Sequence, residues 1–325
     1  MTAPAQPPQS PQSPQPARST RLPLTDRIAG APISWGVCEV PGWGFQLDVD
    51  TVLAQMCEVG IVATEFGPDG FLPDAPADKA ATLSAAGLRA VGQFVPVVLH
   101  DPDHDPLPEV EIAMEGLVAA QASTVVIAAA TGVEGYDARP ELTDAQWDTL
   151  LVNLDLITAA AEARGLIATL HPHVGTIVES GVEAERVLAG SRIGLCLDTG
   201  HLLIGGGDPV ELARLHPERI AHVHLKDVRL DLAKAVQEGR QTYTDAVAAG
   251  MYVPLGAGDV DIAGIVESLE SAGYAGWYVL EQDTVLSGPP FQTGVDPAAD
   301  VRASIAHISA IAGVAGAGKR NRSGS

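Results

Sequence analysis

The sequence predicts a single (β/α)8 barrel of the TIM type, and three features of the chain support this prediction. Short apolar runs rich in valine and isoleucine alternate with longer stretches of alanine, leucine and glutamate at helical spacing. Eight such repeats fit into about 290 residues, the usual count and length for this barrel. An open doubly wound sheet, the alternative fold, would need a phosphate-binding loop, and neither GxGxxG after the first strand nor GxxxxGK[ST] is present.

The order of the expected elements follows these repeats. Strands are expected at residues 28–34, 61–65, 88–96, 124–129, 166–171, 193–198, 219–224 and 277–281. Helices are expected between them at 48–59, 77–86, 109–121, 143–164, 180–189, 208–215, 262–272 and 298–313. Thr143 and Asp208 precede helical stretches, as N-cap residues do. Four of the expected helices end at a glycine, namely Gly60, Gly87, Gly165 and Gly273.

The domain boundaries follow from composition. Residues 1–22 are rich in Pro, Gln and Ser, and residues 316–325 are equally poor in large apolar side chains, so both tails are expected to be disordered. Residues 23–315 then form the barrel domain. Residues 228–258 form a long insertion after the seventh strand, with helices expected at 230–238 and 242–249. On a barrel this insertion lies at the top face, where loops cover active sites.

Charge and cysteine content narrow the class of protein. The chain has 41 acidic and 19 basic residues and a formal net charge of −22, which argues against nucleic acid or an anionic membrane as a partner. The N-terminus has no apolar signal region, and no run of 18 apolar residues predicts a membrane span. Three scattered cysteines are too few for a disulfide framework. We therefore expect a cytoplasmic protein that acts on a small molecule.

Candidate site residues stand at the last positions of five expected strands. They are Glu65, His171, Asp198, His224 and Glu281. Any one of them alone is more often a helix cap or a hydrogen-bonded structural residue. Barrel strands deliver their last side chains to one rim, so five together predict a common site. Imidazole and carboxylate donors without thiolates predict one divalent cation, with Mn, Co, Fe, Zn and Mg all possible.

Two motifs extend this set. In CLDTGH, His201 follows Asp198 by about one helical turn, so both side chains can face the same cavity. Cys196 of the same motif is given little weight as a ligand. In HVHLKD, His222 and His224 lie on the same face of a strand. Since His224 is nearer the top, His222 is interpreted as a core histidine.

The third motif, LHPHVGT, contains two histidines separated by Pro172. Either His171 or His173 could be the metal ligand, and His171 is favoured because it ends the strand. His173 is then a candidate substrate-binding residue.

These motifs resemble the sugar phosphate isomerase/epimerase superfamily, the xylose isomerase-like TIM barrels. Within it they are most similar to the inosose dehydratases, which remove water from 2-keto-myo-inositol. The resemblance covers residues 28–315 and rests on GAPISWG, LHPHVGT, LDTGH, HVHLKDVR and VLEQD. It implies a metal, most often Mn or Co, held by one residue from each of strands five to eight. By position these residues are His171, Asp198, His224 and Glu281.

The resemblance also implies the reaction. Epimerases of the superfamily carry a carboxylate where this chain has His171, and that carboxylate helps to move a proton, so the imidazole favours elimination of water from a ketocyclitol. Isomerisation or epimerisation of a sugar or cyclitol, and eliminative cleavage of a 3-keto-glycoside, remain alternatives because all begin with the same proton abstraction. Phosphodiester cleavage of the endonuclease IV type is disfavoured by the acidic charge. Family barrels often form homo-oligomers.

Roles for the remaining candidates follow from this reaction. Glu65, His201 and Glu281 are the expected proton-transfer groups. Lys226 is expected to bind a substrate oxygen. Trp35 is expected to form an apolar wall against the substrate ring, with a place in the core as its alternative.

Overall fold

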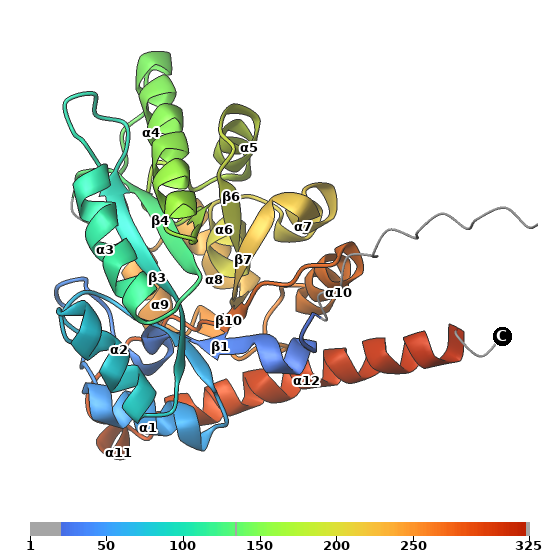
Figure 1. The fold of residues 1–325 in the computed structure, drawn as a ribbon. Coiled ribbons are helices and arrows are strands. Elements are labelled where there is room, and N and C mark those ends of the chain that lie inside the picture. The colour runs from blue at the N-terminus through green and yellow to red at the C-terminus, as the bar shows by residue number, and fades with distance from the viewer. Residues whose placement is uncertain (1–20, 134, 323–325) are drawn as a thin grey trace, which may run out of the picture.

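A computed structural model describes residues 21–133 and 135–322, and in it the expected strands close into a barrel (Figure 1). The strand order is β1-β10-β7-β6-β5-β4-β3-β2, and every pair is parallel. The strands are β1 (Ile28–Gly30), β2 (Ala63–Glu65), β3 (Arg89–Val98), β4 (Thr124–Ala130), β5 (Ile167–Leu170), β6 (Gly194–Asp198), β7 (Ile220–Leu225) and β10 (Tyr278–Leu280). The prediction of a (β/α)8 TIM barrel is therefore confirmed.

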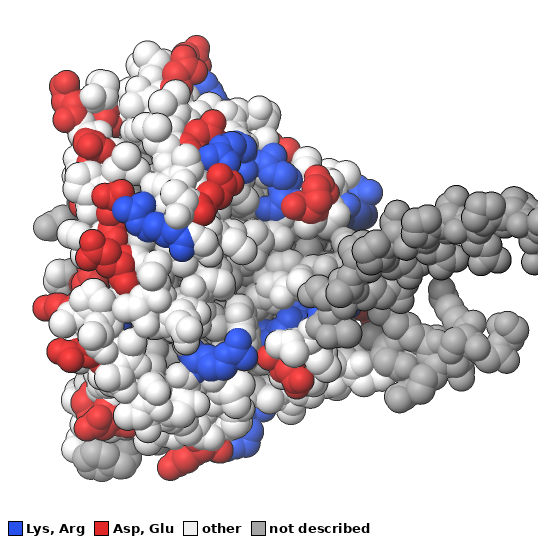
Figure 2. Space-filling view, viewed as in Figure 1, with Lys and Arg blue, Asp and Glu red and all other residues white. Residues whose placement is uncertain are grey.

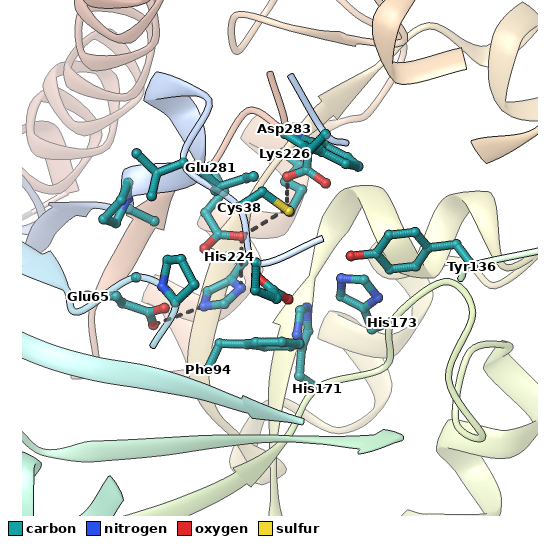
Figure 3. Close-up of a pocket in the computed structure, with 18 residues that line it drawn as sticks. Cys38, Glu65, Phe94, Tyr136, His171, His173, His224, Lys226, Glu281 and Asp283 are labelled. Carbon is teal, nitrogen blue, oxygen red and sulfur yellow. Dashed lines mark hydrogen bonds and ion pairs between the residues drawn. The ribbon is translucent and has the colours of Figure 1, made fainter. Parts of the chain in front are cut away.

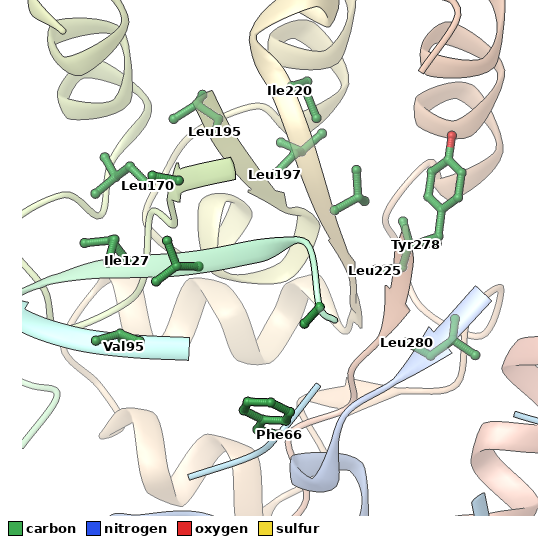
Figure 4. Close-up of a cluster of buried hydrophobic side chains, with 14 of the residues drawn as sticks. Phe66, Val95, Ile127, Leu170, Leu195, Leu197, Ile220, Leu225, Tyr278 and Leu280 are labelled. Atoms are coloured by element: carbon green, nitrogen blue, oxygen red, sulfur yellow. The ribbon is translucent and has the colours of Figure 1, made fainter. Parts of the chain in front are cut away.

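The strands alternate between the two faces of the barrel wall. Side chains on the outer face are large and aliphatic or aromatic and pack against the helices; Figure 4 shows Ile127, Leu170, Leu195, Leu197, Leu225, Tyr278 and Leu280 among them. On the inner face the lower positions are small, as in the buried cluster of Ala29, Ala31, Ala63, Val91 and Val279. Val279 and Asp198 both pair with His224, and paired residues of neighbouring strands point to the same face of a sheet. The ionisable residues of these strands therefore share the inner face with Val279.

Helices surround the barrel at the expected places. They are α1 (Val49–Glu58), α2 (Pro76–Ala85), α3 (Leu107–Ala119), α4 (Asp144–Ala163), α5 (Gly181–Gly190), α7 (Pro209–Leu215), α10 (Ile262–Ala272) and α12 (Pro297–Arg322), with short α6 (Thr199–Ile204) and α11 (Pro290–Thr293) and the 3-10 turns η1 (Leu24–Arg27), η2 (Pro32–Trp35) and η3 (Pro217–Arg219). The side chains of Thr143 and Asp208 accept hydrogen bonds from the first turns of α4 and α7, as expected of N-caps.

The first strand is shorter than expected. It ends at Gly30, and residues 32–35 turn into η2 instead of continuing as a strand. Pro32 has no backbone N–H to donate to a neighbouring strand, and its fixed φ suits the first position of a helical turn. This turn decides where Trp35 lies, as described below.

The insertion after β7 forms a compact cap. It contains β8 (Asp227–Val228), α8 (Leu230–Gln237), α9 (Tyr243–Ala248) and β9 (Tyr252–Val253), and β8 pairs with β9 in antiparallel fashion. Asp227 accepts backbone hydrogen bonds from Gly256, Gly258 and Val260, which fixes the return of the chain to the barrel. A separate hydrophobic cluster joins the insertion to loops of the top face; its fully buried members include Trp43, Val174, Ile204, Val228, Tyr243 and Tyr252.

The two expected tails lie mainly outside the described residues, which exclude 1–20 and 323–325. Arg21 is described, and its guanidinium donates to the backbone oxygens of Glu270 and Tyr274. The helix α12 continues to Arg322, past Gly316, where the sequence predicted an irregular tail.

Acidic residues outnumber basic residues in the chain, and on the face in Figure 2 several basic side chains lie beside acidic ones. Ion pairs join Arg164 to Glu111 and Arg192 to Glu162 between neighbouring elements. Such exposed pairs each stabilise the fold by at most about 1 kcal/mol. In the part of the chain that is described, no helix is both long enough and apolar enough to cross a membrane.

Candidate functional site

A cavity opens at the C-terminal ends of the barrel strands (Figure 3). Barrels of this class place their active sites at this end. The polar residues that line it are Glu39, Glu65, His171, His173, His224, Lys226, Glu281 and Asp283. Its apolar walls are formed by Ala31, Pro32, Ile33, Val37, Trp43, Phe94 and Tyr136. Seven of the eight polar residues come from strand ends or the residues that follow them, whereas Glu39 lies on the loop after η2.

Three of the expected metal ligands come together beside this cavity, and two of them, His224 and Glu281, line it. Ligand atoms of Asp198, His224 and Glu281 all lie within 4.8 Å of one another. His224 Nδ1 is 3.1 Å from Glu281 Oε2 and 3.6 Å from Asp198 Oδ2, yet no described residue hydrogen-bonds this buried nitrogen. A buried nitrogen that faces two carboxylate oxygens without hydrogen-bonding either one is a donor set that fits a divalent cation.

His171 extends this group from β5. Its Nε2 lies 3.1 Å from Asp198 Oδ2, and its ring centroid is 4.8 Å from that of His224. Burial lowers the pKa of His171, which keeps the imidazole neutral, as a metal ligand must be. Among the described residues, the groups of converging ligand atoms include His171 but not His173, whose Nδ1–H donates to the carbonyl oxygen of Val174 at 2.7 Å. The geometry therefore favours His171 as the fourth ligand.

Glu65 holds two imidazoles with a single oxygen. His222 Nε2 donates to Glu65 Oε1 at 2.7 Å, and His224 Nε2 donates to the same oxygen at 3.0 Å. Burial alone would raise the pKa of Glu65, but its interactions with the side chains of His224 and His222 hold it well below its usual range. A carboxylate bonded in this way fixes the tautomer of the ligand histidine. His222, interpreted as a core histidine, is buried and belongs to this network.

His201, like Asp198, does not line the cavity, although a ring nitrogen of His201 lies within 4.8 Å of ligand atoms of His171 and Asp198. Asp198 Oδ1 caps α6 by accepting from the backbone N–H groups of Gly200 and His201. The helix carries the fully buried His201 ring behind that of His173, with 3.7 Å between the ring centroids. Its Nε2 lies 3.6 Å from Asp283 Oδ2. His173, and not His201, is therefore the imidazole of this pair that faces the cavity.

Lys226 is buried beside three carboxylates. Its Nζ contacts Asp283 Oδ1, lies 2.9 Å from Glu281 Oε2 and lies 3.7 Å from Asp198 Oδ2. Burial alone would lower the pKa of Lys226, but these carboxylates hold it well above its usual value, so the ammonium is charged. Sequence reasoning missed Asp283, although it follows Glu281 by two residues and so continues the alternation of β10.

Trp35 is fully buried in the main core, and its Nε1 donates to Gln55 Oε1 at 2.9 Å. The structure does not bring it to the cavity, so the alternative interpretation as a core residue fits. The aromatic walls are instead Phe94, Trp43 and Tyr136, and the ring of Tyr136 stacks on that of His173 with 5.6 Å between the centroids. Trp43 and Tyr136 lie on loops, where no periodic pattern marks them in the sequence.

Cys196 also faces the interior of the barrel, with its sulfur close to ligand nitrogens of His171 and His224. In the sequence, its spacing of two residues from Asp198 indicates that both side chains point to the same face of the strand. Burial raises the pKa of the Cys196 thiol to about 12, so the thiol is protonated and is a poor ligand.

Comparisons with known proteins agree with this architecture. The sequence profile described as xylose isomerase-like TIM barrel matches residues 65–311. An inosose dehydratase of Geobacillus kaustophilus is 34% identical over 278 residues, which cover 81% of this chain and 90% of that protein. The rhizopine catabolism protein MocC of Rhizobium meliloti is 34% identical over 270 residues, which cover 80% of this chain and 82% of that protein.

Two solved structures share the fold at low sequence identity. An L-ribulose 3-epimerase aligns with a TM-score of 0.65 and 17% identity, covering 92% of this chain and 98% of that chain. The IolI protein with a bound zinc atom aligns with a TM-score of 0.63 and 14% identity, covering 88% and 98%. The resemblance to inosose dehydratases found in the motifs is confirmed by the curated relatives. The chain belongs to the xylose isomerase-like TIM barrel family.

Proposed function

We propose that this protein is a metal-dependent hydro-lyase that eliminates water from a ketocyclitol such as 2-keto-myo-inositol. The observation that carries the proposal is the convergence of ligand atoms of Asp198, His224 and Glu281 beside one cavity, which His224, Glu281 and a neutral imidazole, His173, line. The similarity to inosose dehydratases supports the choice of substrate.

The chain offers a candidate ligand set. Asp198, His224 and Glu281 would hold a divalent ion together with His171, and Glu65 would orient His224 from behind. Imidazole and carboxylate donors suit Mn²⁺ or Co²⁺ and also accommodate Zn²⁺, Fe²⁺ or Mg²⁺. When bound, such an ion supplies Lewis-acid stabilisation for the negative charge that develops on the ketone oxygen.

His173 is the candidate for proton transfer. Its Nδ1–H is committed to the Val174 carbonyl, which leaves the lone pair on Nε2 free to accept a proton. Burial, assisted by the charge of Lys226, lowers the pKa of His173 to about 3, so the ring is neutral before substrate binds. Nε2 accepts the proton from the carbon next to the ketone, and the resulting imidazolium is acidic enough to return it to the departing hydroxyl.

The bonds balance in this scheme. The C–H bond next to the ketone and the C–O bond of the β-hydroxyl break, a C=C bond forms, and the transferred proton leaves as part of water. Lys226 donates a hydrogen bond to a substrate oxygen from the same side of the cavity as Glu281. The walls formed by Phe94 and Tyr136 pack against the C–H face of the ring and exclude water from the reacting atoms.

One imidazole that moves a proton out and back suits elimination, whereas epimerisation needs a proton donor on the opposite face of the substrate. Of the acids that line the cavity, Glu65 is engaged by two imidazoles and Asp283 by Lys226 and Tyr243. These contacts support dehydration, and Glu39, the remaining lining acid outside the ligand set, is the group that epimerisation would have to use.

Product analysis tests the proposal. The full chain is incubated with 2-keto-myo-inositol and with a panel of ketosugars and 3-keto-glycosides in deuterated water, with and without Mn²⁺, and products are followed by NMR and mass spectrometry. A diketo product one water lighter than its substrate is expected. An isomer of unchanged formula that carries deuterium next to the ketone would replace dehydration by epimerisation. Release of an aglycone alone would favour eliminative glycoside cleavage.

A further inference from the structure

Lys226 and the metal ligands share a small buried space. The Lys226 ammonium lies 2.9 Å from Glu281 Oε2 and 3.7 Å from Asp198 Oδ2, the same two carboxylates that belong to the candidate ligand set. An ammonium so placed competes with a divalent cation for carboxylate oxygens, and the two positive charges repel each other. A metal can bind here only if another group holds the Lys226 ammonium, so that the ammonium does not pair with the ligand carboxylates.

Asp283 provides the opposing attraction. Its Oδ1 makes the shortest of the three contacts with the Lys226 ammonium. Asp283 is itself buried and is outside the group of converging ligand atoms around Asp198 and His224. A buried carboxylate that bonds a buried ammonium is strongly stabilised by that partner, so this pair fixes the position of the lysine side chain.

The insertion after β7 fixes Asp283 in turn. Tyr243, the first residue of α9, donates from its hydroxyl to Asp283 Oδ2 at 2.6 Å. The same hydroxyl lies 2.9 Å from that of Tyr252 on β9, whose ring has the Lys226 ammonium 5.4 Å from its centroid. The backbone N–H of Tyr243 donates to Asp137 at 3.0 Å, which ties α9 to the loop after β4. The insertion thus contributes one phenol, Tyr243, that donates to the carboxylate holding Lys226, and a second, Tyr252, that contacts the first.

We propose that Asp283, anchored by Tyr243, is a positioning residue that draws the Lys226 ammonium away from Glu281 and Asp198 and leaves these carboxylates free for the metal. This inference rests on the ligand assignment of the proposed function but not on the reaction. It gives the insertion a specific role: through Tyr243 it sets the affinity of the site for a cation and holds Lys226 where a substrate oxygen can reach it.

The test measures Mn²⁺ affinity, so it does not depend on turnover. The full chain is freed of metal with a chelator, and free Mn²⁺ is followed by electron paramagnetic resonance during titration. Asp283→Asn should weaken Mn²⁺ binding by about 10-fold, because Lys226 then pairs only with the ligand carboxylates. Lys226→Met should bind Mn²⁺ at least as tightly as the native chain. The double variant Lys226→Met/Asp283→Asn should recover the affinity of Lys226→Met.

Matched variants separate this role from general destabilisation. Tyr243→Phe should weaken Mn²⁺ binding in the same direction as Asp283→Asn but less, and Lys226→Met should again reverse the loss. Should Asp283→Asn fail to fold, this milder pair carries the same comparison. Tyr274→Phe removes another buried phenol, which donates to the Trp277 carbonyl and not to Asp283, and should leave Mn²⁺ affinity unchanged.

Two results would overturn the inference. Native Mn²⁺ affinity in both Asp283→Asn and Tyr243→Phe would show that Lys226 does not compete for the ligands. A double variant as weak as Asp283→Asn would show that Asp283 acts on the metal directly and not through Lys226. Failure of the proposed reaction is distinguishable, since a chain that binds Mn²⁺ with this pattern but dehydrates no ketocyclitol contradicts the function alone.

Discussion

Replacing Glu65 with glutamine keeps the shape of the side chain but removes the charge that two imidazoles share. Glu65 is only 3% exposed, and its Oε1 accepts from His222 at 2.7 Å and from His224 at 3.0 Å. A hydrogen bond to a charged group contributes about 1.5–3 kcal/mol, against about 0.5–1.5 kcal/mol for a neutral one. Two bonds weakened in this way should lower the free energy of unfolding by about 2 kcal/mol.

The larger effect is expected on the metal. His224 presents Nδ1 to Asp198 and Glu281 only while its Nε2–H is held by Glu65. Loss of the carboxylate behind a ligand histidine typically costs 10–100-fold in metal affinity, and we expect a loss of about that size in Glu65→Gln. With saturating metal, much of the rate should return. A proton-transfer role, the expectation from sequence, would instead leave metal affinity intact and lower the rate at full metal occupancy.

The assay is Mn²⁺ titration combined with urea unfolding of the metal-free chain. Glu270→Gln is the matched control, because Glu270 also accepts two hydrogen bonds, from Arg27 and from the Tyr278 hydroxyl, outside the cavity. It should lose stability by a similar amount and keep its Mn²⁺ affinity. Native Mn²⁺ affinity in Glu65→Gln would refute the reasoning that Glu65 orients His224.

Three further variants test separate parts of the structure. His173→Gln should keep metal and lose about 10²–10⁴ in kcat, and native turnover would remove His173 from the mechanism. Trp35→Phe should lower the melting temperature through loss of the bond to Gln55 yet leave KM unchanged, whereas a raised KM would return Trp35 to the cavity wall. Backbone hydrogen bonds from Ser180 and Glu179 outweigh burial and hold the pKa of Glu183 below its usual range. The charged Glu183 therefore stabilises the fold fully above the pKa of an unfolded glutamate, and this stabilisation is lost as pH falls through the lower pKa of the folded state. Glu183→Gln should lower the free energy of unfolding by about 1 kcal/mol at pH 7 and by progressively less below about pH 4, which unfolding curves measured across pH would report.

The barrel and the convergence of the strand-end residues could be predicted from sequence because both depend on simple periods. Strand residues alternate strictly between two faces, so an acid or histidine that ends an aliphatic strand must reach the rim. The structure brings Asp198, His224 and Glu281 together in this way. Pro172 stops β5 after Leu170, which leaves His171 at the rim beside Asp198.

The residues that were misplaced or missed lie where no such period applies. His201 is one turn along a short helix, and the direction of that helix, set by the Asp198 cap, turns the ring behind His173. Trp35 is the last residue of a turn that begins at Pro32, where the sequence predicted a strand. Tyr243 lies in the insertion after β7, which packs on the top face through contacts between distant parts of the chain. No repeating sequence pattern marks such contacts.

Metal content of the purified chain and of two ligand variants tests the central claim most directly. Inductively coupled plasma mass spectrometry after dialysis against Mn²⁺ should find one divalent ion per native chain. Asp198→Ala and Glu281→Ala should each lose most of it while their circular dichroism spectra stay native, because each removes a carboxylate that faces His224 Nδ1. One ion per chain retained in both variants would contradict the proposed metal centre.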